Sequence, residues 1–205
     1  MPGRTQKALL FLARGFEDLE AAAVTAVCGW TGYREHLPSI HLTTTGLHAE
    51  VQGRFGTRVR PHRHLGDVDP DEYAALAVPG GFFSHGFDEA FDPRLYRVAQ
   101  AIHARGGMIA TWCVGVLPIA EAGLLRGGRA TTYRFSRHHD NPGRLRALGC
   151  EPVPAPLVVW NRIASCAGPA QSLEVAFLLL EFLVGEAGAA EVRRYLAGTD
   201  REGMG

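Results

Sequence analysis

Short apolar runs alternate with segments of helical periodicity along the chain, and this alternation limits the fold to a few architectures. The runs typical of buried strands are Ala8–Ala13, Ile40–Thr45, Leu76–Val78, Met108–Thr111, Leu157–Trp160 and Ile163–Ser165. The segments with helical periodicity or helix-boundary signals are Leu19–Trp30, Pro93–Arg105, Asn141–Leu148 and Ser172–Val184. This succession predicts a doubly wound, mostly parallel α/β sheet with helices on both faces and a small β-hairpin excursion over residues 49–61.

Length and charge bound the class of protein. The 205 residues suffice for one core, and no proline- or serine-rich linker divides them. We therefore expect a single domain over residues 1–198 and a disordered tail over residues 199–205. Twenty-one basic residues balance twenty-one acidic ones, so nothing favours nucleic acid or an anionic membrane as a partner. The N-terminus lacks the pattern of a signal peptide, and we expect a cytoplasmic protein.

Cys113 lies on a predicted strand-to-helix turn, between the strand Met108–Thr111 and the helix start Leu117–Glu121. Such a turn raises a nucleophile above the end of a sheet, and the N–H groups of the next helix favour thiolate. This position predicts a reactive cysteine with a pKa below that of a free thiol. The alternative is a small buried hydrophobe, the usual place of a free cysteine.

Two other predicted strands also end in residues suited to a site. The strand at Leu76–Val78 is followed by the glycine pair Gly80-Gly81, which can present backbone N–H groups to a ligand. The first strand is followed by three acids within residues 15–20. In an open parallel sheet the carboxyl ends of the strands form the ligand crevice. The acids, the glycines and Cys113 are therefore expected to meet.

Five motifs follow one another along the chain, namely Phe16-Glu17-Asp18-Leu19-Glu20, Val78-Pro79-Gly80-Gly81, Cys113-x-Gly115, Gly127-x-x-Ala130-Thr131-Thr132-Tyr133 and Ser165-x-x-Gly168-Pro169-x-x-Ser172-x-Glu174. In these motifs the chain resembles the ThiJ/PfpI superfamily, which has a flavodoxin-like, class I glutamine amidotransferase-like fold. The resemblance implies that Cys113 is the nucleophile, hydrogen-bonded to a protonated Glu20. It also implies an oxyanion site of backbone N–H groups at Gly80, Gly81 and Val114. Members often pair, so a homodimer is expected.

Two departures from the family pattern affect the activity that can be inferred. Members with glyoxalase or deglycase activity have histidine where this chain has Tyr133, and protease-type members have histidine where it has Val114. The glyoxalase, deglycase and protease assignments are all weakened, because each of these activities needs a group that moves protons at the cysteine. Tyr133 is one candidate for that role. His85, His138 and His139 are others, and the alternative for each histidine is a solvated loop residue.

The remaining cysteines and histidines give no metal or disulfide pattern. Four cysteines without paired spacing are expected to be thiols in a reducing cytosol. Cys166 follows another strand and is either a resolving thiol for Cys113 or a packing residue. His62-x-His64 and His138-His139-Asp140 do not supply three or four ligands, so we expect no metal.

Two functions fit these residues. The first is a cofactor-free hydrolase, hydratase or lyase, in which Cys113 attacks a small electrophilic molecule while Glu20 and Tyr133 relay protons. The rings of Phe82 and its neighbours either shape an apolar pocket for that substrate or pack an interface. The second is a non-catalytic redox sensor or stress protein with an oxidisable Cys113. An amidotransferase lacks its His-x-Glu pair here, and no segment remains for a DNA-binding module.

Overall fold

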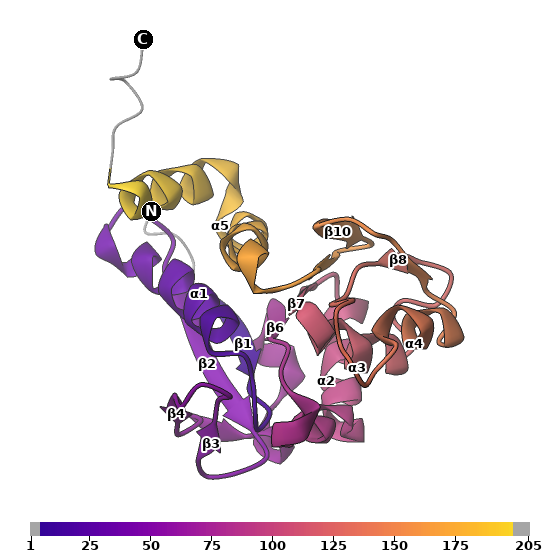
Figure 1. Ribbon diagram of the computed structural model, residues 1–205. Helices are drawn as coiled ribbons and strands as arrows, with labels where there is room; N and C mark the ends of the chain where they lie inside the picture. The colour runs from indigo at the N-terminus through magenta and orange to yellow at the C-terminus, as the bar shows by residue number, and fades with distance from the viewer. Residues whose placement is uncertain (1–4, 199–205) are drawn as a thin grey trace.

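The computed structural model describes residues 5–198, and a seven-stranded sheet forms its centre (Figure 1). The strands are β1 (Gln6–Phe11), β2 (Ile40–Gly46), β5 (Arg63–His64), β6 (Ala75–Val78), β7 (Met108–Trp112), β10 (Leu157–Trp160) and β11 (Ile163–Cys166). Their order across the sheet is β10-β11-β7-β6-β1-β2-β5. Every neighbouring pair is parallel except the antiparallel β10 and β11. The predicted mostly parallel α/β sheet is confirmed.

The central strands are apolar because both faces of the sheet are covered. All four residues of β6 are fully buried, and β7 is buried along its whole length. Strands buried on both faces read as continuous apolar runs without alternation, which is why the sequence shows them clearly. Since β1, β6 and β7 are parallel neighbours, the segments that follow them meet at one edge of the sheet.

Helices cover both faces of this sheet (Figure 1). They are α1 (Asp18–Gly29), α2 (Pro93–Ala104), α3 (Val116–Glu121), α4 (Asn141–Ala147) and α5 (Ser172–Ala197). Helices α1 and α5 pack on each other and on one face, whereas α2 packs on the other face and against α3. Asp92 caps α2, and its carboxylate accepts a hydrogen bond from the Arg94 N–H at 2.8 Å.

Several element boundaries differ from the sequence prediction. The last helix does break after Val184, because Gly185 has non-helical angles (φ 81°, ψ 164°), but helix resumes and ends at Ala197. The predicted hairpin is present in shorter form as β3 (Val51–Gln52) and β4 (Arg58–Val59). A two-stranded sheet of β8 (Arg129–Ala130) and β9 (Glu151–Pro152) was not predicted. Strands of two residues are too short to show a period.

The described residues contain no helix that is both long and apolar enough to cross a membrane. The tail expected at residues 199–205 lies outside the described residues.

Candidate active site

Cys113 lies on a strained turn between β7 and α3. Its φ is 52°, in the left-handed region that side chains other than glycine rarely adopt. A short 3-10 turn over Cys113–Gly115 joins the strand directly to the helix. The residue is 9% exposed. The strand-to-helix turn expected from the sequence is therefore present, and its strain is typical of a nucleophile's position.

Two glycines let the end of β6 approach this turn. A Cβ on Gly115 would lie 2.2 Å from the backbone oxygen of Val78, and one on Gly80 would lie 2.7 Å from the Cβ of Cys113. Real Cβ atoms essentially never come so close to other heavy atoms, so both positions need glycine. Because Gly80 and Gly115 have no side chains, the Gly80-Gly81 backbone can lie beside the thiol.

Glu20 lies fully buried on the first turn of α1. Its Oε2 accepts a hydrogen bond from the Gly80 N–H at 2.7 Å, while its Oε1 has no hydrogen-bond partner among the described residues. Burial and the charge of Glu17 raise the pKa of Glu20 well above its ordinary value, against the effect of the Gly80 hydrogen bond. A neutral Glu20 is thereby favoured. The Gly80 N–H is occupied, so Gly81 and Val114 remain as backbone groups available for an oxyanion.

The pKa of Cys113 differs from the sequence expectation. Burial raises the pKa of this thiol well above its ordinary value, and Glu20 would add to that effect only when it is ionised. The Val114 N–H acts in the opposite direction, but it does not outweigh burial. The expected low pKa rested on the dipole of the following helix, and α3 has only six residues. The hydrogen bond to Glu20 implied by the resemblance is not among the contacts of the described residues.

Glu17 is a site residue to which the sequence pattern assigned no individual role. Its Oε2 accepts a hydrogen bond from the Glu20 N–H at 2.8 Å and so caps α1. Its own N–H donates to the Gly80 oxygen at 2.9 Å. The side chain is only 6% exposed, yet it lines the same cavity as Cys113. Its place beside Glu20 in the motif was the available signal.

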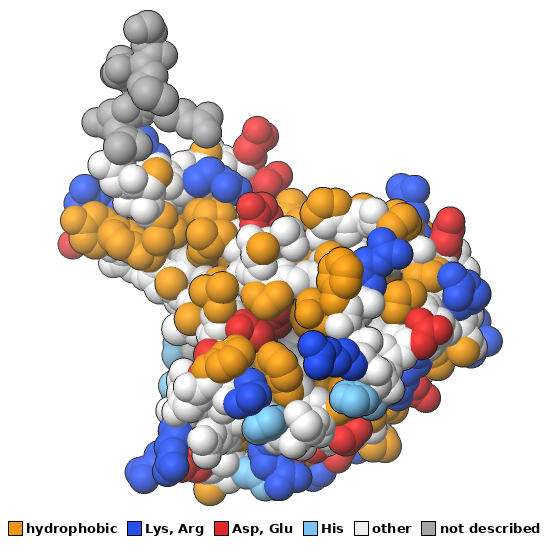
Figure 2. All heavy atoms as spheres, in the orientation of Figure 1, with side chains coloured by type: hydrophobic (Ala, Val, Ile, Leu, Met, Phe, Trp, Pro, Cys, Tyr) orange, Lys and Arg blue, Asp and Glu red, His pale blue; other side chains and the backbone are white. Residues whose placement is uncertain are grey.

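A cavity of about 430 Å³ opens above Cys113. Its lining consists mostly of aromatic, small and basic residues, namely Glu17, Phe55, Gly81, Phe82, Phe83, Ser84, Cys113, Val114, Tyr133, Phe135, Ser136, Arg137, His138, His139, Asn141 and Pro169. Figure 2 shows acidic atoms among hydrophobic side chains near the middle of one face, with basic and histidine side chains close by. Phe55 and Phe135 are strongly exposed, at 67% and 78%. The cavity offers a small molecule several ring faces beside one thiol.

The loop after β8 holds Tyr133 over this cavity. The Thr132 hydroxyl donates to the Cys113 backbone oxygen at 3.0 Å, and the Asn141 side-chain amide donates to the Tyr133 backbone oxygen at 2.8 Å. These bonds tie the loop to the turn that carries the thiol. The Tyr133 ring packs edge-on to Phe135, with ring centroids 6.0 Å apart. Tyr133 therefore lines the same cavity as Cys113.

The three candidate histidines occupy different places. His138 and His139 line the cavity, and the His139 ring lies 4.4 Å from the Phe83 ring, centroid to centroid. His85 is not part of the lining, although its neighbour Ser84 is. The backbone and Cβ of His85 pack against Gly15, and its Nδ1 pairs with the Ser84 hydroxyl at 2.9 Å. Of the two alternatives open for His85, the structure therefore favours a loop residue outside the cavity lining.

All four cysteines are buried free thiols. Cys166 lies opposite Trp112 in the pairing of β11 with β7, and its thiol donates to the Gly168 oxygen at 3.4 Å. Burial raises the pKa of Cys166 to about 12. A fully buried, protonated thiol favours the packing role that the sequence left open. No group of three or more His, Cys, Asp or Glu side chains within residues 5–198 is placed to hold a metal.

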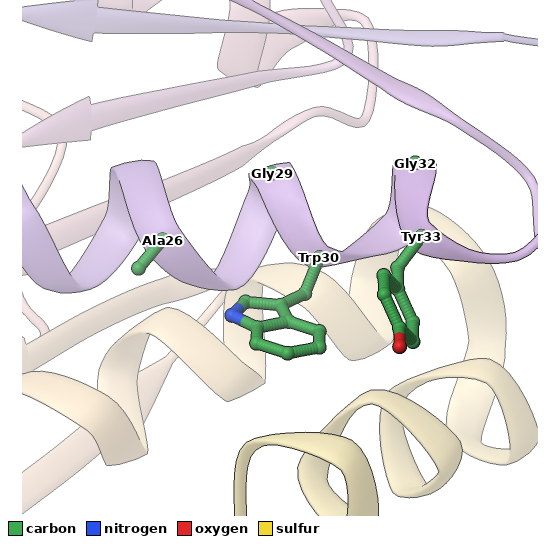
Figure 3. A pocket seen from close by; sticks show the side chains of 5 residues that line it. All are labelled: Ala26, Gly29, Trp30, Gly32 and Tyr33. Atoms are coloured by element: carbon green, nitrogen blue, oxygen red, sulfur yellow. The ribbon is translucent and has the colours of Figure 1, made fainter.

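A second hollow of about 460 Å³ lies at the far end of α1. Ala26, Gly29, Trp30, Gly32 and Tyr33 line it, and Figure 3 shows Trp30 and Tyr33 pointing to the same side of the chain. Helix α1 begins at the carboxyl edge of the sheet, so its other end lies away from Cys113. None of the residues that line this hollow is a cysteine, serine or carboxylate, so we assign it no catalytic role.

The burial of Glu20 predicts a pH-dependent stability. A carboxyl whose folded pKa is raised stays protonated while the unfolded chain ionises, so it lowers the free energy of unfolding as pH rises above about 4.5. The stability of Glu20→Gln relative to the wild type should therefore increase between about pH 4 and pH 8. Urea unfolding at both pH values measures this difference. A constant difference, or one that falls with pH, would contradict the raised pKa.

The chain was compared with family models, with curated proteins and with solved structures, and all three comparisons point to the same protein family. The model of the DJ-1/PfpI family matches residues 6–182. An uncharacterised protein of Methanocaldococcus jannaschii is 27% identical over 63% of this chain and 60% of its own length. The deglycase PfpI of Pyrococcus furiosus is 27% identical over 62% of this chain and 72% of its own. The crystal structure of Drosophila melanogaster DJ-1beta has the same fold, with a TM-score of 0.78 and 23% identity over 94% of this chain and 98% of that one.

Proposed function

Since the chain belongs to the DJ-1/PfpI family, we propose that it is a cofactor-independent enzyme in which Cys113 attacks a small electrophilic substrate. The observation that carries this proposal is the strained φ of 52° at Cys113, on the floor of a cavity and beside a buried carboxyl group. Strain of this kind costs about 1–3 kcal/mol and persists where function requires it. A cysteine used only for packing would not need a left-handed backbone.

The surrounding groups support covalent attack on a carbonyl, imine, nitrile or isonitrile carbon. As the Sγ–C bond forms, negative charge develops on the oxygen of a carbonyl, on the nitrogen of an imine or nitrile, or on the carbon of an isonitrile. Gly81 and Val114 line the cavity, and their backbone N–H groups would stabilise that charge. A neutral Glu20 holds the adjacent backbone in place through its bond to Gly80. Tyr133 lines the cavity from the loop after β8 and carries a hydroxyl group, as do the lining residues Ser84 and Ser136.

The cavity walls favour an electrophile with an apolar body. Five phenylalanine and tyrosine rings line it, those of Phe55, Phe82, Phe83, Tyr133 and Phe135. Val114, only 4% exposed, stands where protease-type members have histidine, so the wall beside the thiol is apolar. An apolar substrate would bury these ring faces, and each buried side chain of this size is worth about 1.5–3 kcal/mol. A very small polar dicarbonyl gains little from such walls.

A panel of electrophiles tests this function. Methylglyoxal, an aromatic nitrile and an aromatic isonitrile are each incubated with the wild type and with Cys113→Ser. We expect weak conversion of methylglyoxal and faster, Cys113-dependent conversion of at least one aromatic compound. The function would be wrong if no compound reacted faster with the wild type than with Cys113→Ser. Rapid methylglyoxal turnover would instead show that the missing histidines are not needed for glyoxalase chemistry.

The redox-sensor alternative has less support. Oxidation by peroxide proceeds through the thiolate, and burial raises the pKa of the Cys113 thiol. A thiol that is mostly protonated and 9% exposed is poorly suited to sense oxidants at neutral pH. The same thiol can serve an enzyme, because a neighbouring base can remove its proton when a substrate is bound.

A further inference from the structure

The mouth of the Cys113 cavity holds a basic side chain that has no ion-pair partner. Arg137 lines the cavity and is exposed, whereas Cys113 is only 9% exposed and lies at the bottom. No carboxylate or aromatic ring within residues 5–198 pairs with the Arg137 guanidinium. Asp140, the acid nearest to it in the chain, instead caps α4, because its carboxylate accepts a hydrogen bond from the Gly143 N–H at 2.8 Å. The guanidinium is therefore available to a ligand in the cavity.

The loop that carries Arg137 is folded by bonds of its own. The Ser136 hydroxyl accepts hydrogen bonds from the His138 N–H at 3.4 Å and from the His139 N–H at 3.2 Å. A serine that bonds to the backbone two or three residues ahead fixes a tight turn. The four residues from Ser136 to His139 all line the cavity. The Arg137 side chain therefore starts from a defined position at the rim.

Two pairs of aromatic rings line the same cavity. Phe55 and Phe82 lie edge-on with centroids 5.7 Å apart, and Asp18 holds Phe55 there by accepting a hydrogen bond from its N–H at 2.9 Å. Tyr133 and Phe135 form the second pair. Phe55 and Phe135 are the most exposed of these side chains, so protein atoms leave much of their surface uncovered. Uncovered ring faces favour a planar aromatic ligand.

The charged groups of the cavity give such a ligand a direction. Glu17 is the carboxyl group among the lining residues; it is almost fully buried, and its N–H donates to the oxygen of Gly80, which lies against Cys113. An anionic group at this inner end would lose water and meet a second carboxyl group. At the mouth it would keep part of its hydration and meet Arg137. A ligand would therefore turn its uncharged end to the thiol and its anionic end to the mouth.

We propose that the Cys113 cavity binds aryl carboxylates and that Arg137 is the specificity-determining residue that pairs with the carboxylate. This deepens the enzymatic function proposed above and rests on it. The substrate is then an aromatic electrophile with its reactive carbon at one end of the ring and a carboxylate at the other. Arginine suits this role because its planar guanidinium can donate two parallel N–H bonds to one carboxylate.

Binding is tested without any reaction, by using para-methylbenzoate and its uncharged analogue para-methylbenzamide. Neither reacts with a thiol, so each is measured by calorimetry and by how far it protects Cys113 from iodoacetamide. We expect the wild type to bind the carboxylate about 5- to 20-fold more tightly than the amide, the range between an exposed ion pair and a charge-assisted hydrogen bond. Arg137→Gln should bind both compounds alike.

Arg134→Gln is the matched control for net charge. Arg134 is an exposed arginine of the same loop that does not line the cavity, so its loss should leave the preference for the carboxylate unchanged. The panel of electrophiles described above is extended with para-formylbenzoate and para-formylbenzamide. Below saturation, the ratio of their Cys113-dependent rates should be about 5- to 20-fold higher in the wild type than in Arg137→Gln. Comparing ratios cancels the difference in intrinsic reactivity of the two aldehydes.

The outcomes separate this site from the proposed function. If the carboxylate binds through Arg137 but no electrophile of the panel reacts faster than with Cys113→Ser, the binding site stands and the enzymatic function fails. If electrophiles react but the wild type binds the amide as tightly as the carboxylate, the function stands and the carboxylate site is wrong. A preference that survives in Arg137→Gln, or that is lost equally in Arg134→Gln, would overturn the role of Arg137. Binding that leaves Cys113 unprotected would place the ligand outside the cavity and would also overturn the proposal.

Discussion

Iodoacetamide alkylation of Cys113 should become about 100-fold faster between pH 7 and pH 9, because thiolate rises about tenfold per pH unit below the thiol pKa. Burial keeps that pKa well above its ordinary value. The rate should still be rising at pH 9. Mass spectrometry of quenched samples measures the rate at each pH.

The other thiols provide little background in this experiment. Cys28 and Cys166 are at most 1% exposed, and burial raises the pKa of each to about 12. The pKa of Cys150 is raised to about 11 for the same reason. Cys113→Ser should therefore remove the fast label from the folded protein. A rate that is already constant below pH 8 would restore the low pKa expected from the sequence and remove the need for a base.

Gly115→Ala should lower the melting temperature by about 6–12 °C, equivalent to roughly 3 kcal/mol or more. The added Cβ would lie 2.2 Å from the Val78 oxygen and 2.7 Å from the Pro79 oxygen. Both are backbone atoms of the segment that presents the Gly80-Gly81 backbone, so they cannot rotate away as a side chain would. The turn must move away from β6, which also separates the thiol from Gly81. Thermal unfolding and Cys113 alkylation measure the two effects.

Gly29→Ala is the matched control for the added methyl group. Gly29 ends α1 with φ −62° and ψ −35°, and nothing lies within 4 Å of a Cβ built there. Alanine should be neutral or stabilise the protein by up to about 1 kcal/mol, because it favours helix over glycine. If Gly115→Ala melted as high as Gly29→Ala, the close approach of the turn to β6 would not be required for folding.

Much of the fold followed from local patterns. The apolar runs at β1, β6 and β7 are visible because strands buried on both faces need apolar residues at every position. Cys113 and the glycine pair could be placed at strand ends for the same reason. The short strands β8 and β9 could not be predicted, because two residues hold no periodicity.

The electrostatics of the site depended on contacts between distant segments. The first turn of α1 meets the end of β6 through the bonds of Glu17 and Glu20 to Gly80, across some sixty residues of sequence. This packing buries both carboxyl groups and Cys113 together, and it reverses the direction expected for the thiol pKa. A contact between distant segments also decides the place of His85. The backbone of His85 packs on Gly15, and His85 lies outside the cavity lining.

The sequence by itself therefore determined the parallel sheet, the position of Cys113 at a strand end and the glycines around it, because these depend on spacing along one strand and the turn that follows. Only the tertiary structure decided the direction of the Cys113 pKa shift, the place of His85 outside the cavity lining and the place of Glu17 in that lining. Desolvation depends on every segment packed around a group, and no spacing within a single segment records it.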